Sequence, residues 1–161
     1  MEIRSGCLED AADLLEIYRP LVLDTVISFE ETLPSVEQFG ERMERALDRY
    51  VWLVAEIESR PAGYAYATQF RSRSAYRFAV ETTIYIDSQF HGRGLGRRLY
   101  EALFGELSKR DFRQAFAGIT LPNDPSIALH RSVGFVPVGT LRRVGYKFEQ
   151  WHDVSWWQRS I

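Results

Sequence analysis

A glycine-rich stretch in the second half of the chain has the residue types and spacing of an anion-binding loop. It runs Gln89-Phe90-His91-Gly92-Arg93-Gly94-Leu95-Gly96, after a strand-like segment and before a helix-like one. Closely spaced glycines let the backbone approach a ligand without interference from Cβ atoms. Unpaired N–H groups at a helix N-terminus then face the anion. A phosphate or pyrophosphate is the expected ligand, with Arg93, Arg97 and Arg98 adding charge; the alternative is a glycine-rich turn that only starts a helix.

Two other phosphate motifs do not fit this stretch. In the dinucleotide pattern G-x-G-x-x-G, Gly92 and Gly94 would be the first two glycines, but Arg97 occupies the third position. The P-loop requires Gly-Lys-Ser/Thr, which the chain lacks. The pattern that does fit is Gln/Arg-x-x-Gly-x-Gly/Ala, carried by Gln89, Gly92 and Gly94.

A carboxylate in an apolar strand-like segment is the second candidate for chemistry. Glu81 stands among Val80, Thr82 and Ile84. Partial removal of water from a carboxylate raises its pKa, which suits a general base that takes a proton from an ammonium group. The alternative is a structural ion pair between Glu81 and an arginine on a neighbouring strand, and the residues alone leave both open.

The elements that must position these residues alternate between strand-like and helix-like patterns. Strands are expected at 2–5, 51–57, 63–70, 78–87, 113–121, 134–148 and 151–159, the 134–148 strand being bulged near Gly139 and Gly145. Helices are expected at 8–22, 36–50 and 95–109, with a short one opening at Asn123-Asp124-Pro125-Ser126. Residues 60–63 are predicted to form a turn that joins two strands into a hairpin. This order predicts an α/β fold with a single mixed, largely antiparallel sheet and flanking helices.

Length and composition limit the classes of protein. The chain has 161 residues, 45% of them hydrophobic, which predicts one globular domain over 1–161. Lys+Arg is 20 and Asp+Glu is 22, so the net charge of −2 does not favour a nucleic-acid partner. The aromatic residues Tyr146, Trp151, Trp156 and Trp157 are instead expected to serve the core and an interface.

Cysteine and histidine usage argues against a metal. The single Cys7 can form neither an internal disulfide nor a cysteine-based metal site, and the three histidines lack ligand spacing, so no metal is expected. No secretory leader pattern and no apolar run of about 18 residues is present, so a cytoplasmic protein without a membrane partner is expected.

Together these motifs resemble the GNAT acetyltransferase superfamily from end to end. The Gln89/Gly92/Gly94 pattern is similar to its acetyl-CoA pyrophosphate motif. Within the superfamily the chain resembles phosphinothricin N-acetyltransferases and their relatives that act on methionine sulfoximine and methionine sulfone. The segments that carry this closer match are 80–86 (VETTIYI), 121–126 (LPNDPS), 139–142 (GTLR), 145–147 (GYK) and 151–154 (WHDV).

The resemblance implies a set of residues for acetyl-CoA. The strand of Ile84, Tyr85 and Ile86 is expected to splay from its neighbour and to offer backbone groups to the acetyl carbonyl and the pantetheine arm. Asn123 is expected to hydrogen-bond the pantetheine chain. The pyrophosphate is expected to contact the backbone of the loop and first helical turn: Gly92, Arg93, Gly94, Leu95, Gly96 and Arg97.

The resemblance also implies catalytic roles. It favours Glu81 as the base or as the partner of the substrate ammonium. Many superfamily members carry a tyrosine near the CoA sulfur where this chain has His130, as the phosphinothricin-type enzymes do. A histidine there could donate a proton to the thiolate or relay one from the amine, and the alternative is a structural histidine.

An acceptor that resembles an amino acid carries a carboxylate, and a guanidinium matches such a group. Arg71 and Arg73 are therefore candidates, Arg73 more so because Arg73-Ser74-Ala75-Tyr76 fits the Arg-x-Ala-Tyr pattern of the family; the alternative is a solvated arginine loop. Phe29, Thr82 and Thr83 complete the predicted acceptor site. The resemblance implies a homodimer with acceptor pockets near the subunit boundary.

The function predicted by the residues and the resemblance is transfer of the acetyl group of acetyl-CoA to the amine of a small amino-acid-like acceptor. Direct attack in a ternary complex is expected, because Cys7 lies far in sequence from the loop. The alternatives are an acetyltransferase for a protein N-terminus or a polyamine, and an acyl-CoA sensor without turnover. Arg71, Arg73 and Arg77 argue against a polyamine.

Overall fold

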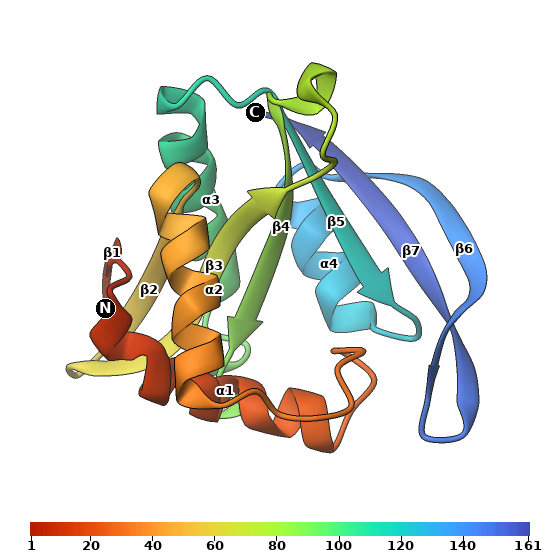
Figure 1. Cartoon of the computed structure of the whole chain (residues 1–161), viewed down its shortest axis with the longest axis horizontal. Coiled ribbons are helices and arrows are strands. Elements are labelled where there is room, and N and C mark those ends of the chain that lie inside the picture. Colours follow the sequence, from red (N-terminus) through yellow and green to blue (C-terminus); the bar gives the residue numbers. More distant parts are fainter.

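The computed structural model describes all residues, 1–161, and its centre is one seven-stranded sheet (Figure 1). The strand order is β1-β2-β3-β4-β5-β7-β6, and every neighbouring pair is antiparallel except β4 and β5. This confirms the predicted mixed, largely antiparallel sheet. The strands are β1 (Glu2–Ser5), β2 (Trp52–Ile57), β3 (Arg60–Gln69), β4 (Ala79–Ile86), β5 (Gln114–Thr120), β6 (Val136–Lys147) and β7 (Gln150–Ser160).

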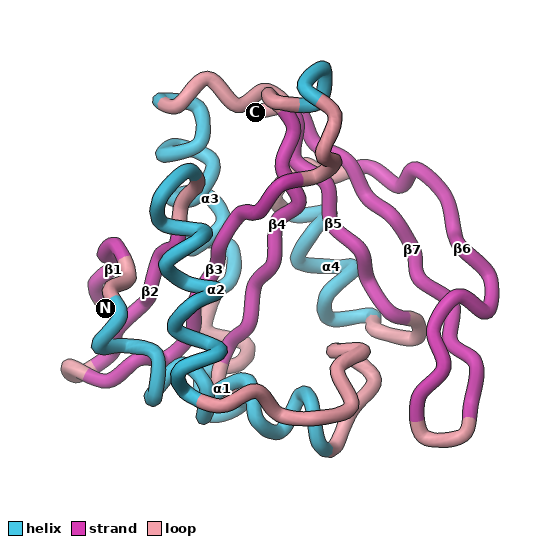
Figure 2. Tube along the Cα trace, viewed as in Figure 1, coloured by secondary structure: helices cyan, strands magenta, loops and turns pink.

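Helices cover both faces of this sheet (Figure 2). They are α1 (Ala11–Leu23), α2 (Val36–Arg49), α3 (Leu95–Lys109) and α4 (Asp124–Ser132), with 3-10 turns at Leu8–Asp10, Ser74–Tyr76 and Ser88–Phe90. Apolar side chains of α1 and α2 pack against Trp52, Val54 and Tyr64 in one buried cluster. Leucines of α3 pack with the alternate residues of β2 and β3 in a second cluster on the other face. No helix is both long and apolar enough to cross a membrane.

The start of α2 at Val36 is the predicted one, and Ser35 caps it. The Ser35 Oγ accepts from the Gln38 N–H at 3.2 Å, and the Gln38 Oε1 accepts from the Ser35 N–H at 2.9 Å. This reciprocal capping box satisfies two N–H groups that a helix end otherwise leaves unpaired. The helix ends at Arg49, one residue before the predicted end.

The feature of the sheet that matters for function is the divergence of β4 and β5. They pair only at Ala79–Gln114, Val80–Ala115 and Glu81–Phe116. Beyond Glu81 the two strands separate, and α4 lies behind the widening gap (Figure 1). The backbone of β4 from Thr82 onward is therefore not paired with β5, as the family resemblance implied.

Two further predicted boundaries are wrong. Residues 60–63 do not form a turn but begin β3, and the turn lies at Glu58 and Ser59, which both have positive φ. Pro61 is accommodated in the strand because the β2–β3 register shifts beside its partner Glu56. The predicted helix 8–22 is a 3-10 turn followed by α1.

The β6–β7 hairpin forms an arm that extends beyond the rest of the sheet (Figure 1). Its register shifts between Pro137 and Gly139 and again between Leu141 and Gly145, as predicted for the bulged strand. Of the four C-terminal aromatic residues expected in the core or an interface, Trp157 is buried, whereas Tyr146 and Trp151 are 54% and 53% exposed.

Candidate active site

Three neighbouring cavities follow the gap between β4 and β5. We call them the glycine-loop groove, of about 500 Å³, the central cavity, of about 200 Å³, and the outer cavity, of about 310 Å³. The groove and the central cavity share Ile84, Tyr85 and Asn123. The central and outer cavities share Phe29 and Glu81. The central cavity therefore lies between the other two.

The glycine-loop groove brings together most of the residues predicted for acetyl-CoA. Gly92 and Gly94 line it, and both have φ of 74°. Gly94 stands at the N-cap position of α3, so the first N–H groups of that helix face the groove. The other predicted residues that line it are Ile84, Tyr85, Ile86, Leu95, Gly96, Arg97 and Asn123. Arg93 does not line it: its guanidinium lies over the Phe90 ring.

Glu81 lies at the junction of the central and outer cavities and is half-buried. Burial raises the pKa of its carboxyl group above the usual range, while the charge of Arg71 opposes that shift. Glu81 forms no salt bridge, so the predicted alternative of an ion pair with an arginine on a neighbouring strand is not observed. A carboxylate in this setting can accept a proton from a group in either cavity.

His130 lines the central cavity from α4 and is only 4% exposed. Its Nδ1 lies 2.7 Å from the Ser126 carbonyl oxygen, and its Nε2 lies 2.9 Å from the Tyr100 hydroxyl. Because a carbonyl only accepts, Nδ1 carries the proton and Nε2 accepts from Tyr100. Burial lowers the pKa of His130, so the imidazole is neutral near pH 7.

The predicted acceptor residues are not all at the cavities. Phe29 lines both the central and the outer cavity, and Thr82 and Thr83 line the central one. Arg71 and Arg73 are exposed and line none of the three. The Arg71 guanidinium lies over the Phe70 ring at 4.4 Å, so its influence on Glu81 is through charge alone.

The loop that carries Phe29 is held by a buried lysine of β6. Lys147 is 2% exposed, and its Nζ donates to the carbonyl oxygens of Val22 at 2.6 Å and Ser28 at 2.7 Å. The Ser28 Oγ also lies 2.5 Å from the Tyr18 hydroxyl. These bonds tie the segment between α1 and α2 to the sheet beside the central cavity.

Sequence reasoning missed several residues at these cavities. Tyr100, which was not singled out from the sequence, lines the central cavity. Trp156, expected in the core or an interface, lines the outer one. Ser126 orients His130, and Lys147 orients the Phe29 loop. The only signals for Ser126 and Lys147 were their places in the segments 121–126 (LPNDPS) and 145–147 (GYK) that match the family. No group of three or more His, Cys, Asp or Glu side chains could hold a metal ion.

Comparisons with known proteins agree with this arrangement. The family model for the acetyltransferase (GNAT) domain matches residues 3–156. A phosphinothricin N-acetyltransferase from Streptomyces viridochromogenes is 39% identical over 161 residues, which cover 100% of this chain and 88% of that protein.

Two crystal structures are similar over nearly the whole chain. One is a phosphinothricin acetyltransferase from Sinorhizobium meliloti in complex with acetyl-CoA, with a TM-score of 0.95 and 38% identity, covering 99% of this chain and 88% of that one. The other is a ribosomal-protein-alanine N-acetyltransferase from Brucella melitensis, with a TM-score of 0.96 and 38% identity, covering 100% of both chains.

A sheet whose central strands diverge beside a glycine loop, together with these matches, defines an N-acetyltransferase. The chain belongs to the GNAT acetyltransferase family.

Proposed function

We propose that this protein transfers the acetyl group of acetyl-CoA to the amine of a small amino-acid-like acceptor of the phosphinothricin or methionine sulfoximine and sulfone type. The observation that carries the proposal is the order of the three cavities, with Glu81 where the central and outer ones meet. A CoA thioester in the groove would place its acetyl group in the central cavity. An acceptor would enter through the outer cavity, past Phe29 and Glu81.

The groove supplies the contacts that CoA requires. The backbone N–H groups around Gly94 would bind the pyrophosphate at the start of α3, assisted by Arg97. The backbone of β4 at Ile84 to Ile86, left unpaired by β5, would bind the pantetheine arm and the thioester carbonyl. The Asn123 amide would bind the pantetheine chain.

In the reaction the amine nitrogen attacks the thioester carbonyl carbon, the N–C bond forms and the C–S bond breaks. Glu81 takes the proton from the amine, directly or through a water. CoA leaves as the thiolate, which the Tyr100 hydroxyl would stabilise by donating its single hydrogen to the sulfur. His130 Nε2 accepts that hydrogen in the free protein, so the hydroxyl would turn from His130 to the sulfur as the thiolate forms. Both substrates would be bound at once, an arrangement that the shared lining of the central and outer cavities supports.

A panel of acceptors tests the proposal through release of free thiol from acetyl-CoA. It contains phosphinothricin, methionine sulfoximine, methionine sulfone, ordinary amino acids, spermidine and a peptide with an N-terminal alanine. Saturable turnover confined to the amino-acid-like compounds is expected. Turnover only with the peptide, the acceptor type named for the Brucella relative, or only with spermidine would overturn the acceptor class. Acetyl-CoA binding without any turnover would favour a sensor.

Replacing Gly94 with valine is expected to raise the KM for acetyl-CoA about tenfold or more, since a β-branched residue is strained at positive φ. Acceptor KM should change little. Gly105→Ala is the matched control: it lies in α3, a Cβ there meets nothing within 4 Å, and its φ is not positive. Steady-state kinetics with each substrate varied separately measures both constants, and an unaltered acetyl-CoA KM would contradict the phosphate role of the loop.

We further propose a homodimer formed through the β6–β7 arm. A cluster of seven large hydrophobic side chains is exposed along this arm, and exposed apolar patches mark interaction surfaces. Leu141 and Val144 of β6 also wall the outer cavity. The cluster consists of Val136, Val138, Leu141, Val144, Tyr146, Phe148 and Trp151.

The double variant Tyr146→Glu/Trp151→Glu is expected to sediment as a monomer, because it places charges on that surface. Sedimentation velocity at matched concentrations measures this, with the native protein expected at twice the monomer mass. Val36→Glu, which changes an exposed apolar residue at the start of α2, is the control and should leave the mass unchanged. A native protein that sediments as a monomer would reject the dimer.

A further inference from the structure

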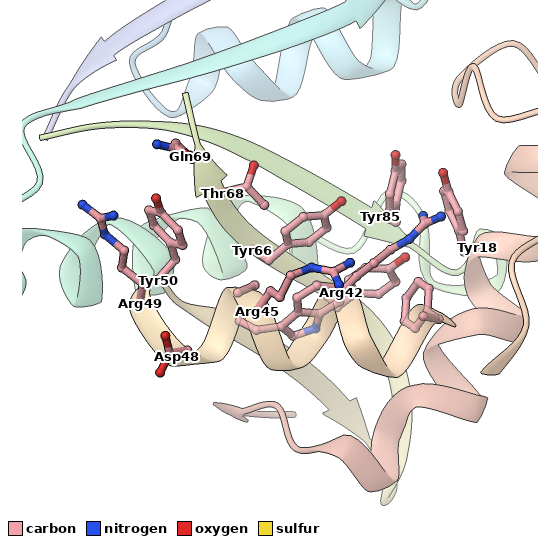
Figure 3. Close-up of a pocket in the computed structure, with 14 residues that line it drawn as sticks. Tyr18, Arg42, Arg45, Asp48, Arg49, Tyr50, Tyr66, Thr68, Gln69 and Tyr85 are labelled. Atoms are coloured by element: carbon pink, nitrogen blue, oxygen red, sulfur yellow. The ribbon is translucent and has the colours of Figure 1, made fainter. Parts of the chain in front are cut away.

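A fourth cavity, of about 550 Å³, lies between α2 and the sheet and is not used by the proposed reaction. We call it the α2 pocket. Figure 3 shows Arg42, Arg45 and Arg49 extending from α2 along it, with Tyr66 rising from β3 and Tyr85 from β4. Its volume is that of a typical small-molecule site.

The floor of the α2 pocket is aromatic. The Trp52 ring stacks on Tyr66 with centroids 4.1 Å apart and on Tyr64 with centroids 5.4 Å apart. Phe39 of α2 meets both Trp52 and Tyr64 edge-on, at 5.8 and 6.1 Å. Such a surface favours a flat, apolar ligand, because aromatic pairs gain energy beyond the area that they bury.

Phenol hydroxyl groups supply hydrogen-bond donors in this pocket. Tyr64 is 1% exposed, and its hydroxyl forms no hydrogen bond within the chain, in contrast to that of Tyr18, which binds Ser28 and Glu30. Burial raises the pKa of Tyr64, Tyr66 and Tyr85, so all three remain neutral donors at physiological pH. In the same pocket the Trp52 Nε1–H is buried without a hydrogen-bond partner, so the pocket holds donors that a ligand acceptor could satisfy.

Positive charge stands above this floor. Arg42, Arg45 and Arg49 follow one another on α2 at spacings of three and four residues, which places them on one side of the helix. Arg42 is paired with Glu30 at 2.6 Å, whereas the nearest carboxylate to Arg45 is Glu41 at 3.8 Å on the exposed surface. Asp48 is the one carboxylate that lines the pocket, so the lining carries a positive excess.

We propose that the α2 pocket binds a small aromatic carboxylate at a site distinct from the reaction cavities. The ring would lie against Tyr66, the partly exposed member of the aromatic stack, since Trp52 and Tyr64 are only 2% and 1% exposed. The carboxylate would accept from Arg45 and the Tyr64 hydroxyl. Of the pocket residues, only Tyr85 also lines the central cavity and the groove. Tyr18 and Arg42 line the pocket and Ser28 lines the central cavity. Tyr18 bonds to Ser28 and Glu30, and Glu30 pairs with Arg42.

Binding is tested by fluorine NMR with 4-fluorophenylacetate as the probe, on the full chain and with no reaction taking place. Saturable broadening and a shift of the fluorine signal are expected, and 4-fluorophenylacetamide, which lacks the charge, should bind at least about tenfold more weakly. Arg45→Gln and Tyr64→Phe should each weaken binding of the acid by about fivefold to tenfold. Arg19→Gln, at an exposed arginine of α1 paired with Glu16, is the matched control.

The site is separate only if the reaction substrates leave the probe in place. Saturating acetyl-CoA, and separately saturating phosphinothricin, should not displace it. Displacement by either compound would overturn the proposal, because the probe would then occupy the groove or the acceptor cavities. Absence of saturable binding, or equal binding by the Arg45→Gln and Tyr64→Phe variants, would overturn it as well. This test does not depend on the proposed acetyl transfer.

Discussion

Glu81→Gln is expected to lower kcat about 100-fold or more, the range that a positioned general base contributes. The substitution keeps the shape of the side chain and removes its ability to take a proton. Because Glu81 forms no salt bridge, its loss leaves no arginine unpaired, and the fold should persist. Glu44→Gln, at an exposed carboxylate of α2, is the matched control and should retain full activity. Circular dichroism and thermal unfolding of both variants verify that the fold is intact.

The pH dependence of kcat/KM provides the sharper test of this role. Burial raises the pKa of Glu81, so its carboxylate becomes protonated at a higher pH than an exposed glutamate would. Activity should fall on the acid side as pH drops through that raised value, since the protonated group cannot act as a base. This acid limb should be absent from the residual activity of Glu81→Gln. An identical profile in both proteins would mean that another group accepts the proton.

Local chemistry explains why much of the fold could be predicted. Ser35 and Gln38 form a capping box whose geometry depends only on four consecutive residues, and the predicted start of α2 is confirmed. The glycine loop could also be predicted from local sequence, because Gly92 and Gly94 have positive φ, a backbone conformation that favours glycine. The predicted turn at 60–63 failed because Pro61 and Gly63 also suit a turn in isolation. In the folded chain these residues pair with β2 and form the start of strand β3 instead.

The residues that sequence reasoning missed depend on contacts between distant segments. Tyr100 and His130 are thirty residues apart, and nothing within either helix indicates that they share a hydrogen bond. Trp156 alternates along β7 like a core residue, but the divergence of β4 and β5 opens a cavity beside it. Arg71 is predicted for the acceptor on its charge, and its guanidinium lies over the Phe70 ring outside the three cavities. Its contact with an acceptor stays a prediction. The cavities themselves follow from the strand divergence, which no single segment encodes.

Lys147 illustrates how such a distant contact could control the acceptor site. A lysine is rarely buried unless its ammonium group is paired, and here no carboxylate contacts it directly. Two carbonyl oxygens, of Val22 and Ser28, accept from its Nζ instead. Burial lowers the pKa of the ammonium group, and the nearby charges of Glu30 and Glu31 oppose that shift. The side chain thus joins β6 to the loop that ends in Phe29, and Gly145 of the same strand leaves room for the Phe29 ring.

Lys147→Met is therefore expected to lower the free energy of unfolding by about 2–4 kcal/mol, because two buried carbonyl groups lose their donor. Phe29 would be held less firmly, so the acceptor KM should rise about tenfold or more, while the KM for acetyl-CoA should change little. The second lysine of the chain, Lys109, is exposed on α3 and paired with Glu106, and Lys109→Met is the matched control. Denaturant titration measures the loss of stability, and the KM values for the acceptor and for acetyl-CoA measure the effect on the acceptor site. A variant that loses stability but keeps its acceptor KM would limit Lys147 to a structural role, and one that keeps both would show that the Phe29 loop is held by other contacts.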